Sequence, residues 1–251
     1  MKIPKMIDFY YWPTPNGWKV SIMLEECGID YQMIPLNISE GEQFDPNFLT
    51  ISPNNRMPAI VDTEPTEEYN RRPVTVFESG CILLYLARKT KKFLPNDPLG
   101  EKEMFEWLFW QVGNLGPMAG QVSHFVNYAD IENPYAKLRY ANEYNRCIGV
   151  LERRLANNEW LAGNDYSICD MASWPWVLIS KPLGQVLDDF PNVTRWRNKI
   201  KKRPAVRRGV DLGKELRRSA PPTEKERKLL YHQTAQSTAE MERKFRVKRK
   251  T

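Results

Sequence analysis

The chain has 251 residues, of which 41% are hydrophobic and 27% charged, and a formal net charge of +6. That length fits two domains better than one. No apolar run approaches the roughly 20 residues that a membrane span needs, and residues 1–6 lack the apolar stretch of a secretory signal. We therefore expect a soluble, cytoplasmic protein without a membrane partner.

The histidines and cysteines exclude several classes of site. The chain has only two histidines, so a histidine-rich metal centre is excluded and we expect no metal cofactor. Its four cysteines are scattered and form no C-x-x-C pair, which suggests neither a zinc knuckle nor a disulfide framework and indicates free, mostly buried thiols. No Gly-x-Ser-x-Gly elbow, P-loop or dinucleotide-binding glycine pattern occurs, so hydrolase and nucleotide-binding functions are disfavoured.

The positive charge is concentrated at the C-terminal end. Residues 213–251 contain 12 Lys/Arg against 5 Asp/Glu, which leaves 25 against 26 in residues 1–212. Because the body of the protein is nearly neutral, a nucleic-acid partner is not expected.

The first 90 residues alternate between strand and helix signals. Residues 7–11, 31–36, 59–61 and 74–77 are β-rich, whereas 18–27, 46–51 and 79–89 have helical spacing or helix-start signals. The predicted order is therefore βαβαββα, one sheet covered by helices. Polar residues 91–100, with two prolines, are the expected linker.

The rest of the chain is predicted to be helical. The segments with helical spacing are 101–111, 134–155, 167–179 and 192–202, and the glycines between 113 and 120 are expected to bend or break the first of them. Ser167 and Asp170 have the spacing of a capping box that starts the third segment. The expected domains are thus 1–90, an all-helical domain 101–212, and a basic, partly disordered tail 213–251, with a short helix near 224–231 as an alternative.

Several motifs in this order resemble the glutathione transferase superfamily. The general ones are SPNNRMPA at 52–59, where the family has a cis peptide before proline, FESG at 77–80, and the capping box at 167–170. Three more, TPNG at 14–17, GEQF at 41–44 and WLFWQ at 107–111, resemble the nu-class disulfide-bond oxidoreductases, which are related to the fungal nitrogen-catabolite regulators. The resemblance covers about residues 6–208 and implies a thioredoxin-like N-terminal domain, a helical-bundle C-terminal domain and a homodimer.

The resemblance implies a glutathione site in the first domain. A cis Met57-Pro58 bond would turn the Met57 main chain toward the cysteinyl amide of glutathione. Ser79, at a helix start, would receive the γ-glutamyl carboxylate, and Glu78 would accept from its ammonium. The alternative for Ser79 is a simple helix cap, and for Met57-Pro58 an ordinary trans turn.

Three further residues are assigned to glutathione by resemblance. Gln43 and Arg56 would lie toward its glycyl end, with solvated loop positions as the alternative. Arg139 would reach across a dimer to the neighbouring site, with an ordinary surface arginine as the alternative.

The sulfur of glutathione is the atom on which the chemistry depends. Thr14 and Asn16 offer a hydroxyl and an amide at the approach to the first helix, and such donors can stabilise a thiolate. The alternatives are that 14–17 is only a turn, or that Tyr10 or Tyr11 is the donor. No cysteine lies in this loop, so a mixed disulfide with the protein is disfavoured.

The function that follows is glutathione-dependent reduction of a small-molecule disulfide, with Thr14 and Asn16 as the catalytic groups. One alternative is a glutathione S-transferase that conjugates an electrophile, with Trp12, Phe109, Trp110, His124 and Phe125 near the second substrate. Another is a non-catalytic regulator that binds glutathione and a protein partner.

Overall fold

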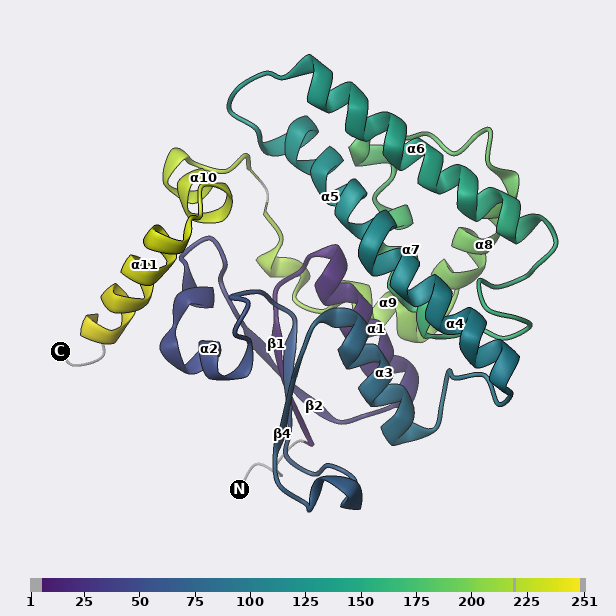
Figure 1. Cartoon of the computed structure of the whole chain (residues 1–251), viewed down its shortest axis with the longest axis horizontal. Coiled ribbons are helices and arrows are strands. Elements are labelled where there is room, and N and C mark those ends of the chain that lie inside the picture. The colour runs from purple at the N-terminus through teal and green to yellow at the C-terminus, as the bar shows by residue number, and fades with distance from the viewer. Residues whose placement is uncertain (1–5, 219, 249–251) are drawn as a thin grey trace.

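The computed structural model describes residues 6–218 and 220–248, and it contains a sheet domain followed by a helical domain (Figure 1). In the described part of the chain, none of the helices combines the length and apolarity that membrane crossing requires. The elements of the sheet domain are β1 (Ile7–Tyr11), α1 (Pro15–Cys27), β2 (Tyr31–Pro35), η1 (Glu42–Phe44), α2 (Pro46–Ile51), β3 (Ala59–Asp62), η2 (Glu67–Tyr69), β4 (Val74–Phe77) and α3 (Ser79–Thr90).

The four strands form one mixed sheet in the order β2-β1-β3-β4. Strand β1 runs parallel to β2 and antiparallel to β3, and β3 is antiparallel to β4. Side chains alternate along β1, so that Ile7, Phe9 and Tyr11 are buried in the main core. This arrangement confirms the predicted βαβαββα order and the thioredoxin-like domain.

Helix α1 begins three residues earlier than its apolar spacing predicts. Thr14 is its N-cap, with a hydroxyl that accepts from the Gly17 N–H at 3.3 Å, and Pro15 takes the first helical position. A Cβ on Gly17 would lie 2.4 Å from the Trp12 carbonyl oxygen, so only glycine fits there. The loop 14–17 is therefore both a turn and the capped start of a helix.

The helical domain starts at α4, whose N-cap is Asp97. Its elements are α4 (Pro98–Trp110), the π-helical turn η3 (Gln111–Leu115), α5 (Gly116–Ser123), the π-helical turn η4 (His124–Tyr128), α6 (Pro134–Ala156), α7 (Ile168–Leu178), η5 (Lys181–Leu183), α8 (Pro191–Lys201) and α9 (Pro204–Asp211). The bend expected around residues 113–120 appears as η3 between α4 and α5, so the helix continues with one widened turn.

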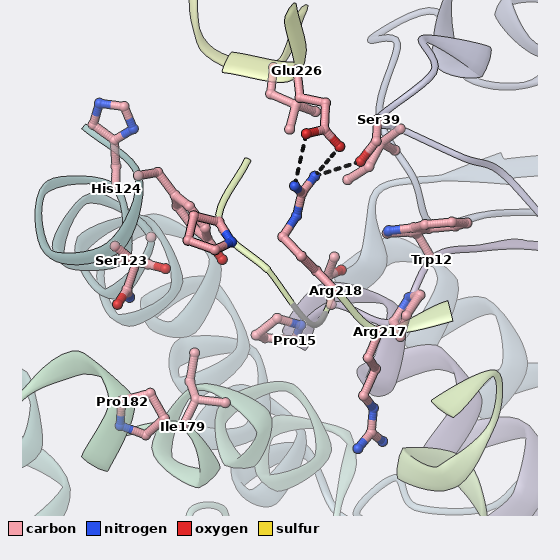
Figure 2. A pocket seen from close by; sticks show the side chains of 18 of the residues that line it. Trp12, Pro15, Ser39, Ser123, His124, Ile179, Pro182, Arg217, Arg218 and Glu226 are labelled. Atoms are coloured by element: carbon pink, nitrogen blue, oxygen red, sulfur yellow. Dashed lines mark hydrogen bonds and ion pairs between the residues drawn. The ribbon is translucent and has the colours of Figure 1, made fainter. Parts of the chain in front are cut away.

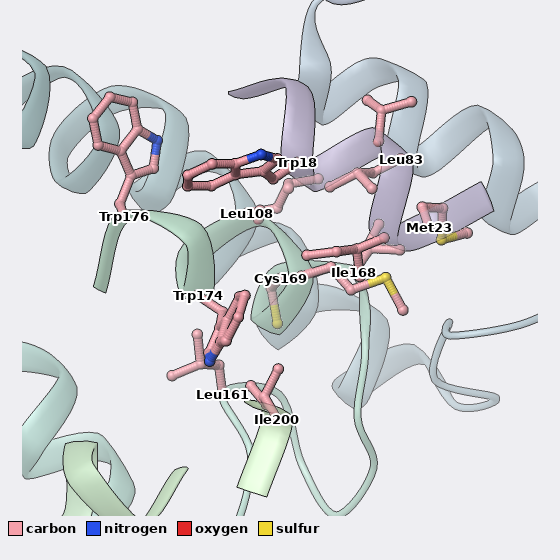
Figure 3. Close-up of a cluster of buried hydrophobic side chains, with 14 of the residues drawn as sticks. Trp18, Met23, Leu83, Leu108, Leu161, Ile168, Cys169, Trp174, Trp176 and Ile200 are labelled. Carbon is pink, nitrogen blue, oxygen red and sulfur yellow. The ribbon is translucent and has the colours of Figure 1, made fainter. Parts of the chain in front are cut away.

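The two domains share one hydrophobic core. Helix α1 packs against α3 in its own domain and against α7 and α9 in the other. Figure 3 shows Trp18 of α1, Leu108 of α4 and Ile168 of α7 in one cluster. Contact with α9 is so close that a Cβ on Gly209 would lie 2.7 Å from the Ile22 nitrogen, and the Ser21 hydroxyl donates to the Gly209 carbonyl at 2.6 Å. The domain boundary is therefore a packed interface.

The chain after α9 forms η6 (Lys214–Leu216), α10 (Glu224–Tyr231) and α11 (Ala235–Lys248). Helix α10 occupies residues 224–231, the range predicted as the alternative to a disordered tail. The sequence did not predict α11. The composition is polar enough for disorder, but α11 lies beside η1 and α2 (Figure 1). Helix α11 is therefore held by contacts with the sheet domain, which the local sequence does not show.

The start of α7 is fixed by a buried carboxylate. Asp170 accepts from the Ser167 N–H at 3.1 Å, from the Leu161 N–H at 3.0 Å and from the Trp196 indole N–H at 2.8 Å. The first of these is the contact predicted from the capping-box spacing. Asp170 thereby joins α7 to the preceding loop and to α8.

Replacing Asp170 by alanine should destabilise the protein strongly, because three buried donors would lose their acceptor. We expect the free energy of unfolding to fall by about 3–5 kcal/mol, measured by urea denaturation. Asp165→Ala, at an exposed position nearby, is the matched control and should change it by less than about 0.5 kcal/mol. Equal effects of the two variants would contradict this account of Asp170.

Candidate active site

Two adjoining clefts lie between the start of α1 and the helical domain. We call the first the Trp12 cleft, about 850 Å³, and the second the Ser79 cleft, about 730 Å³; both are in the size range of small-molecule sites. The residues that line both are Gly120, His124, Trp176, Leu230 and Tyr231. Because Leu230 and Tyr231 belong to α10, the C-terminal segment lies where the two clefts meet.

Thr14 and Asn16 lie on the two sides of this junction. Thr14 lines the Trp12 cleft, and its hydroxyl donates to the Met57 sulfur at 3.5 Å. Asn16 lines the Ser79 cleft, and its side-chain oxygen accepts from the Trp176 indole N–H at 3.3 Å. Because that hydrogen bond holds the oxygen of Asn16, the amide NH₂ is left to face other partners.

A buried lysine lies under the Ser79 cleft. Lys19 of α1 is 2% exposed, and its ammonium donates to the Gln111 side-chain oxygen at 2.7 Å and to the Ser79 hydroxyl at 3.4 Å. Burial lowers the pKa of Lys19 to about 7, although the charge of Glu78 acts in the opposite direction. The three bonded residues come from α1, α3 and η3, so this cluster joins the two domains beside the cleft.

The segment before α3 has the geometry of a binding loop. Glu78 has φ 67°, in the region that favours glycine, and its carboxylate accepts from the Asn54 amide at 3.3 Å. Ser79 begins α3 and lines the cleft together with Glu78. The Met57-Pro58 peptide is cis, which confirms the prediction made from the SPNNRMPA motif.

The residues expected near the glycyl end of glutathione and across the dimer do not all line the Ser79 cleft. Arg56 lines the Ser79 cleft, and its guanidinium donates to the Gln233 side-chain oxygen at 2.9 Å. Gln43 is buried in η1, lines neither cleft, and its side-chain oxygen has no hydrogen-bond partner among the described residues. Arg139 is exposed on α6, pairs with Glu143 at 3.6 Å and also lines neither cleft. Within one chain, therefore, the structure does not bring Gln43 or Arg139 to the cleft.

The competing donors to sulfur lie elsewhere. The hydroxyl of Tyr11 donates to the Leu212 carbonyl at 3.0 Å, and burial raises the pKa of Tyr11. The ring of Tyr10 packs on Phe48. All four cysteines are described, and none lines either cleft: three are buried and Cys81 is exposed on α3. A protein thiol is therefore not placed at the site.

The aromatic residues expected near a second substrate separate into two groups. Trp12 and His124 line the Trp12 cleft (Figure 2). Phe125 stacks on Tyr140, Trp110 packs against Trp107, and Phe109 is 68% exposed. Only the first two are therefore positioned to meet a ligand in these clefts.

The C-terminal segment closes one side of the Trp12 cleft. Figure 2 shows Arg218 reaching Glu226 of α10 and Ser39, at 2.8 Å and 2.7 Å. The ring of Tyr231 stacks on Tyr128 and meets His124 edge-on, with centroids 5.5 Å and 4.9 Å apart. These contacts join residues after α9 to both domains.

Sequence reasoning did not identify Lys19, Gln111 or Trp176 as site residues. One signal was available for Lys19, because it lies one helical turn from Ile22 and Met23 on the apolar side of the first helix. Gln111 ends the WLFWQ motif at 107–111, which indicated the family but not a place in the site. Trp176 carries no such signal. The places of both residues depend on how the helical domain packs against α1.

A thioredoxin-like sheet with a cis-proline, packed on a helical domain with a cleft between them, defines the class of the glutathione transferases. The family model "Glutathione S-transferase, N-terminal domain" matches residues 4–88, and "Glutathione S-transferase, C-terminal domain" matches 118–204. The chain belongs to the glutathione S-transferase family. This confirms the predicted superfamily and fold.

Individual relatives indicate the branch. The chain is 48% identical to the disulfide-bond oxidoreductase YfcG of Escherichia coli over 80% of its own length and 93% of that protein. It is 30% identical to the protein URE2 of Candida albicans over 80% of this chain and 68% of that protein. A glutathione transferase from Pseudomonas putida with one glutathione disulfide bound per subunit has a TM-score of 0.78 at 38% identity, covering 85% of this chain and 94% of that one. This glutathione-dependent enzyme is thus similar to the nu-class oxidoreductases and related to the Ure2 proteins.

Removing the Tyr231 ring should release α10, because the segment would lose its aromatic contacts with η4. We expect trypsin to cleave Tyr231→Ala after Arg227 or Lys228 about tenfold faster than the unchanged protein, followed by mass spectrometry. Glu224→Ala removes only an exposed pair with Lys228 and is the control, with little expected change. Unchanged cleavage of Tyr231→Ala would show that other contacts hold the segment.

Proposed function

We propose that this protein is a glutathione-dependent disulfide-bond reductase that acts without a thiol of its own. The observation that carries the proposal is that Thr14 lines one and Asn16 the other of two adjoining clefts at the start of α1, neither of which is lined by a cysteine. The similarity to YfcG, named a disulfide-bond oxidoreductase, and to a transferase with bound glutathione disulfide supports this reaction.

Glutathione would bind along the Ser79 cleft. Its γ-glutamyl carboxylate would accept from the Ser79 hydroxyl and the N–H groups at the start of α3, and its ammonium would donate to Glu78. The main chain at Met57, before cis Pro58, would pair with the cysteinyl amide. Arg56 is available toward the glycyl end after it exchanges Gln233 for a carboxylate, a stronger acceptor. Gln43 would need to turn toward the ligand from its buried place in η1.

The sulfur would lie at the start of α1, between Thr14 and Asn16. Lowering a thiol pKa by two units requires about 2.7 kcal/mol of thiolate stabilisation, which one or two good donors can supply. The hydroxyl of Thr14 now donates to the thioether of Met57, a weak acceptor, and a thiolate would replace it. The amide of Asn16 is held by Trp176 through its oxygen, so its NH₂ is the end that meets the anion.

The reaction proceeds by two thiol–disulfide exchanges. The glutathione thiolate attacks one sulfur of a small disulfide, forms a new S–S bond, and releases the other sulfur as a thiolate that takes up a proton. A second glutathione thiolate then attacks the mixed disulfide and releases the second thiol. The products are one glutathione disulfide and two thiols, so electrons balance without a protein cysteine.

Two other functions would use the same binding site. Conjugation would replace the disulfide by an electrophile in the Trp12 cleft, where Trp12, Trp18 and Trp176 offer apolar contact. A regulator would bind glutathione without turnover, and the relation to URE2 is the reason to test it. Measuring the reduction of 2-hydroxyethyl disulfide together with glutathione binding distinguishes both functions from the proposed disulfide reductase.

Substitutions of Asn16 can test the oxygen and the NH₂ group of its side-chain amide separately. Asn16→Asp keeps an oxygen for Trp176 but replaces the NH₂ donors by a negative charge, so it should reduce kcat/KM for 2-hydroxyethyl disulfide by about 100-fold or more, and Asn16→Ala by about 10- to 100-fold. If Asn16 only anchored Trp176, Asn16→Asp would retain activity.

The controls for that experiment lie in the same loop and on α3. Thr14→Ser keeps both the hydroxyl and the helix cap and should stay within a few-fold of the unchanged protein, whereas Thr14→Val should lose activity. Cys81→Ser, which removes the exposed thiol, should leave turnover unchanged. Activity lost with Cys81 and retained without Asn16 would contradict the mechanism.

We further propose a homodimer in which Arg139 completes the neighbouring site. Exposed apolar side chains on β4 and α4–η3 support an interface: Phe77 is 37%, Phe109 68% and Val112 38% exposed. Arg139 lies on α6 with 55% of its side chain exposed, free to meet a second chain beyond its pair with Glu143.

Arg139→Ala should raise the KM for glutathione about tenfold with little change in kcat, because a charge-assisted contact to a carboxylate would be lost. Arg146→Ala, on the same helix and likewise paired with Glu143, is the matched control and should leave KM unchanged. Sedimentation velocity should give a dimer for all three proteins. A monomer that turns over normally would contradict the role of Arg139.

A further inference from the structure

The ammonium of Lys19 is buried without a carboxylate partner. It is 2% exposed and donates to two neutral oxygens, one on Gln111 and one on Ser79. Among the described residues no acidic side chain forms an ion pair with it, whereas Lys89, whose side chain is 11% exposed, has the buried carboxylate of Asp62 at 2.7 Å. Glu78 acts on this charge without forming an ion pair with it. A buried charge without a directly bonded counter-ion is costly, so an anion that bound beside this cluster would stabilise it.

The Ser79 cleft offers a place for such an anion. The Ser79 hydroxyl lies 3.4 Å from the ammonium of Lys19 and also lines the Ser79 cleft, at the N-terminal end of a twelve-residue helix. A carboxylate that accepts from this hydroxyl would lie about 5–6 Å from the ammonium, two hydrogen-bond lengths away. Lys19, Ser79 and Gln111 are all buried, so the attraction would be screened less than between two charges at the protein surface.

A second polar group beside the cleft also lacks a hydrogen-bond partner. The side chain of Gln111 is fully buried, its oxygen is held by Lys19, and its NH₂ has no hydrogen-bond partner among the described residues. Gly116 makes room for this NH₂, since a Cβ there would lie 2.6 Å from it. Lys19 and Gln111 therefore present an excess of donors beside the cleft.

We propose that Lys19 is a positioning residue for glutathione, which acts through Ser79 to hold the γ-glutamyl carboxylate and takes up a proton when that carboxylate binds. This inference rests on the proposed function, because it concerns how the same site recognises its ligand. In the ligand-free protein burial disfavours the charged lysine, and an anion beside Ser79 favours it. Binding and protonation are therefore coupled.

The ionisable groups around Lys19 fix the direction of the pH dependence. Glu78, at the start of α3, is the charged side chain that acts on it, and it favours the charged form. The other ionisable side chains that line this cleft are Arg56, His124 and Tyr231. Since the pKa of Lys19 is about 7 without ligand, the lysine is already charged below pH 7. Above that value binding must include proton uptake, so affinity falls as pH rises.

The test uses S-methylglutathione, because it has no thiol whose own ionisation would release a proton. Calorimetric titration at pH 7.5 in two buffers of different ionisation enthalpy should give an uptake of about 0.5–1 proton for each ligand bound. The Kd of the unchanged protein should rise by up to about tenfold per pH unit between pH 7 and 8.5. This pH profile requires no substitution and so does not depend on the folding of a variant.

Lys19→Met keeps an unbranched side chain that is one atom shorter and removes the charge. We expect it to take up no proton, to bind about tenfold or more weakly at pH 6.5, and to show a flat Kd between pH 6.5 and 8.5. The matched control is Lys92→Met, which removes another lysine of the sheet domain that donates to a main-chain carbonyl, that of Cys27, remote from both clefts. It should behave as the unchanged protein.

The outcomes are separable. Binding of S-methylglutathione with no proton uptake, or equal uptake in Lys19→Met and the unchanged protein, would overturn the role of Lys19 and leave the proposed function standing. Failure of the unchanged protein to bind S-methylglutathione at all would overturn the proposed function, and with it this inference.

Discussion

The packing of α1 between the two domains is the constraint on which the rest of the structure depends. Helix α1 packs against α3 in its own domain and against α7 and α9 in the helical domain, with main-chain contact at Gly209. Its N-terminus is therefore held at the domain boundary, where the side chains of α7 and η3 meet it. The clefts lie beside the helix through which the two domains share one core.

That shared helix also explains why polar groups at the boundary are held so specifically. Asn16 is oriented by Trp176 from α7, and Lys19 is oriented by Gln111 from η3. In each case a residue from the helical domain fixes a residue of the sheet domain. The first domain supplies the groups that would meet glutathione, and the second determines which of their atoms face the cleft.

The sequence was informative wherever local rules decide the structure. Alternating and helical patterns predicted the strands and the main helices, and the proline motif predicted the cis bond at Met57-Pro58. Capping chemistry predicted the start of α7 at Ser167. The place of Trp176 was not predictable in this way, because packing against Asn16, 160 residues away in the sequence, determines it. The helical spacing of Lys19 could indicate that it is buried but not that its partners are Ser79 and Gln111. Helix α11 was not predictable either, because its polar sequence favours disorder and its contacts with η1 and α2 are not visible in the local sequence.

The wall that α10 contributes to the clefts has a consequence for how this branch of the family can diversify. The two family models end at residues 88 and 204, whereas Arg217, Arg218 and Tyr231 come from beyond them. A change confined to the last part of the gene, by extension, loss or frameshift, would therefore reshape the space beside α1 while the loops at the start of α1 and before α3 keep their sequence. Two paralogues could share every residue that holds the tripeptide and still accept different partners.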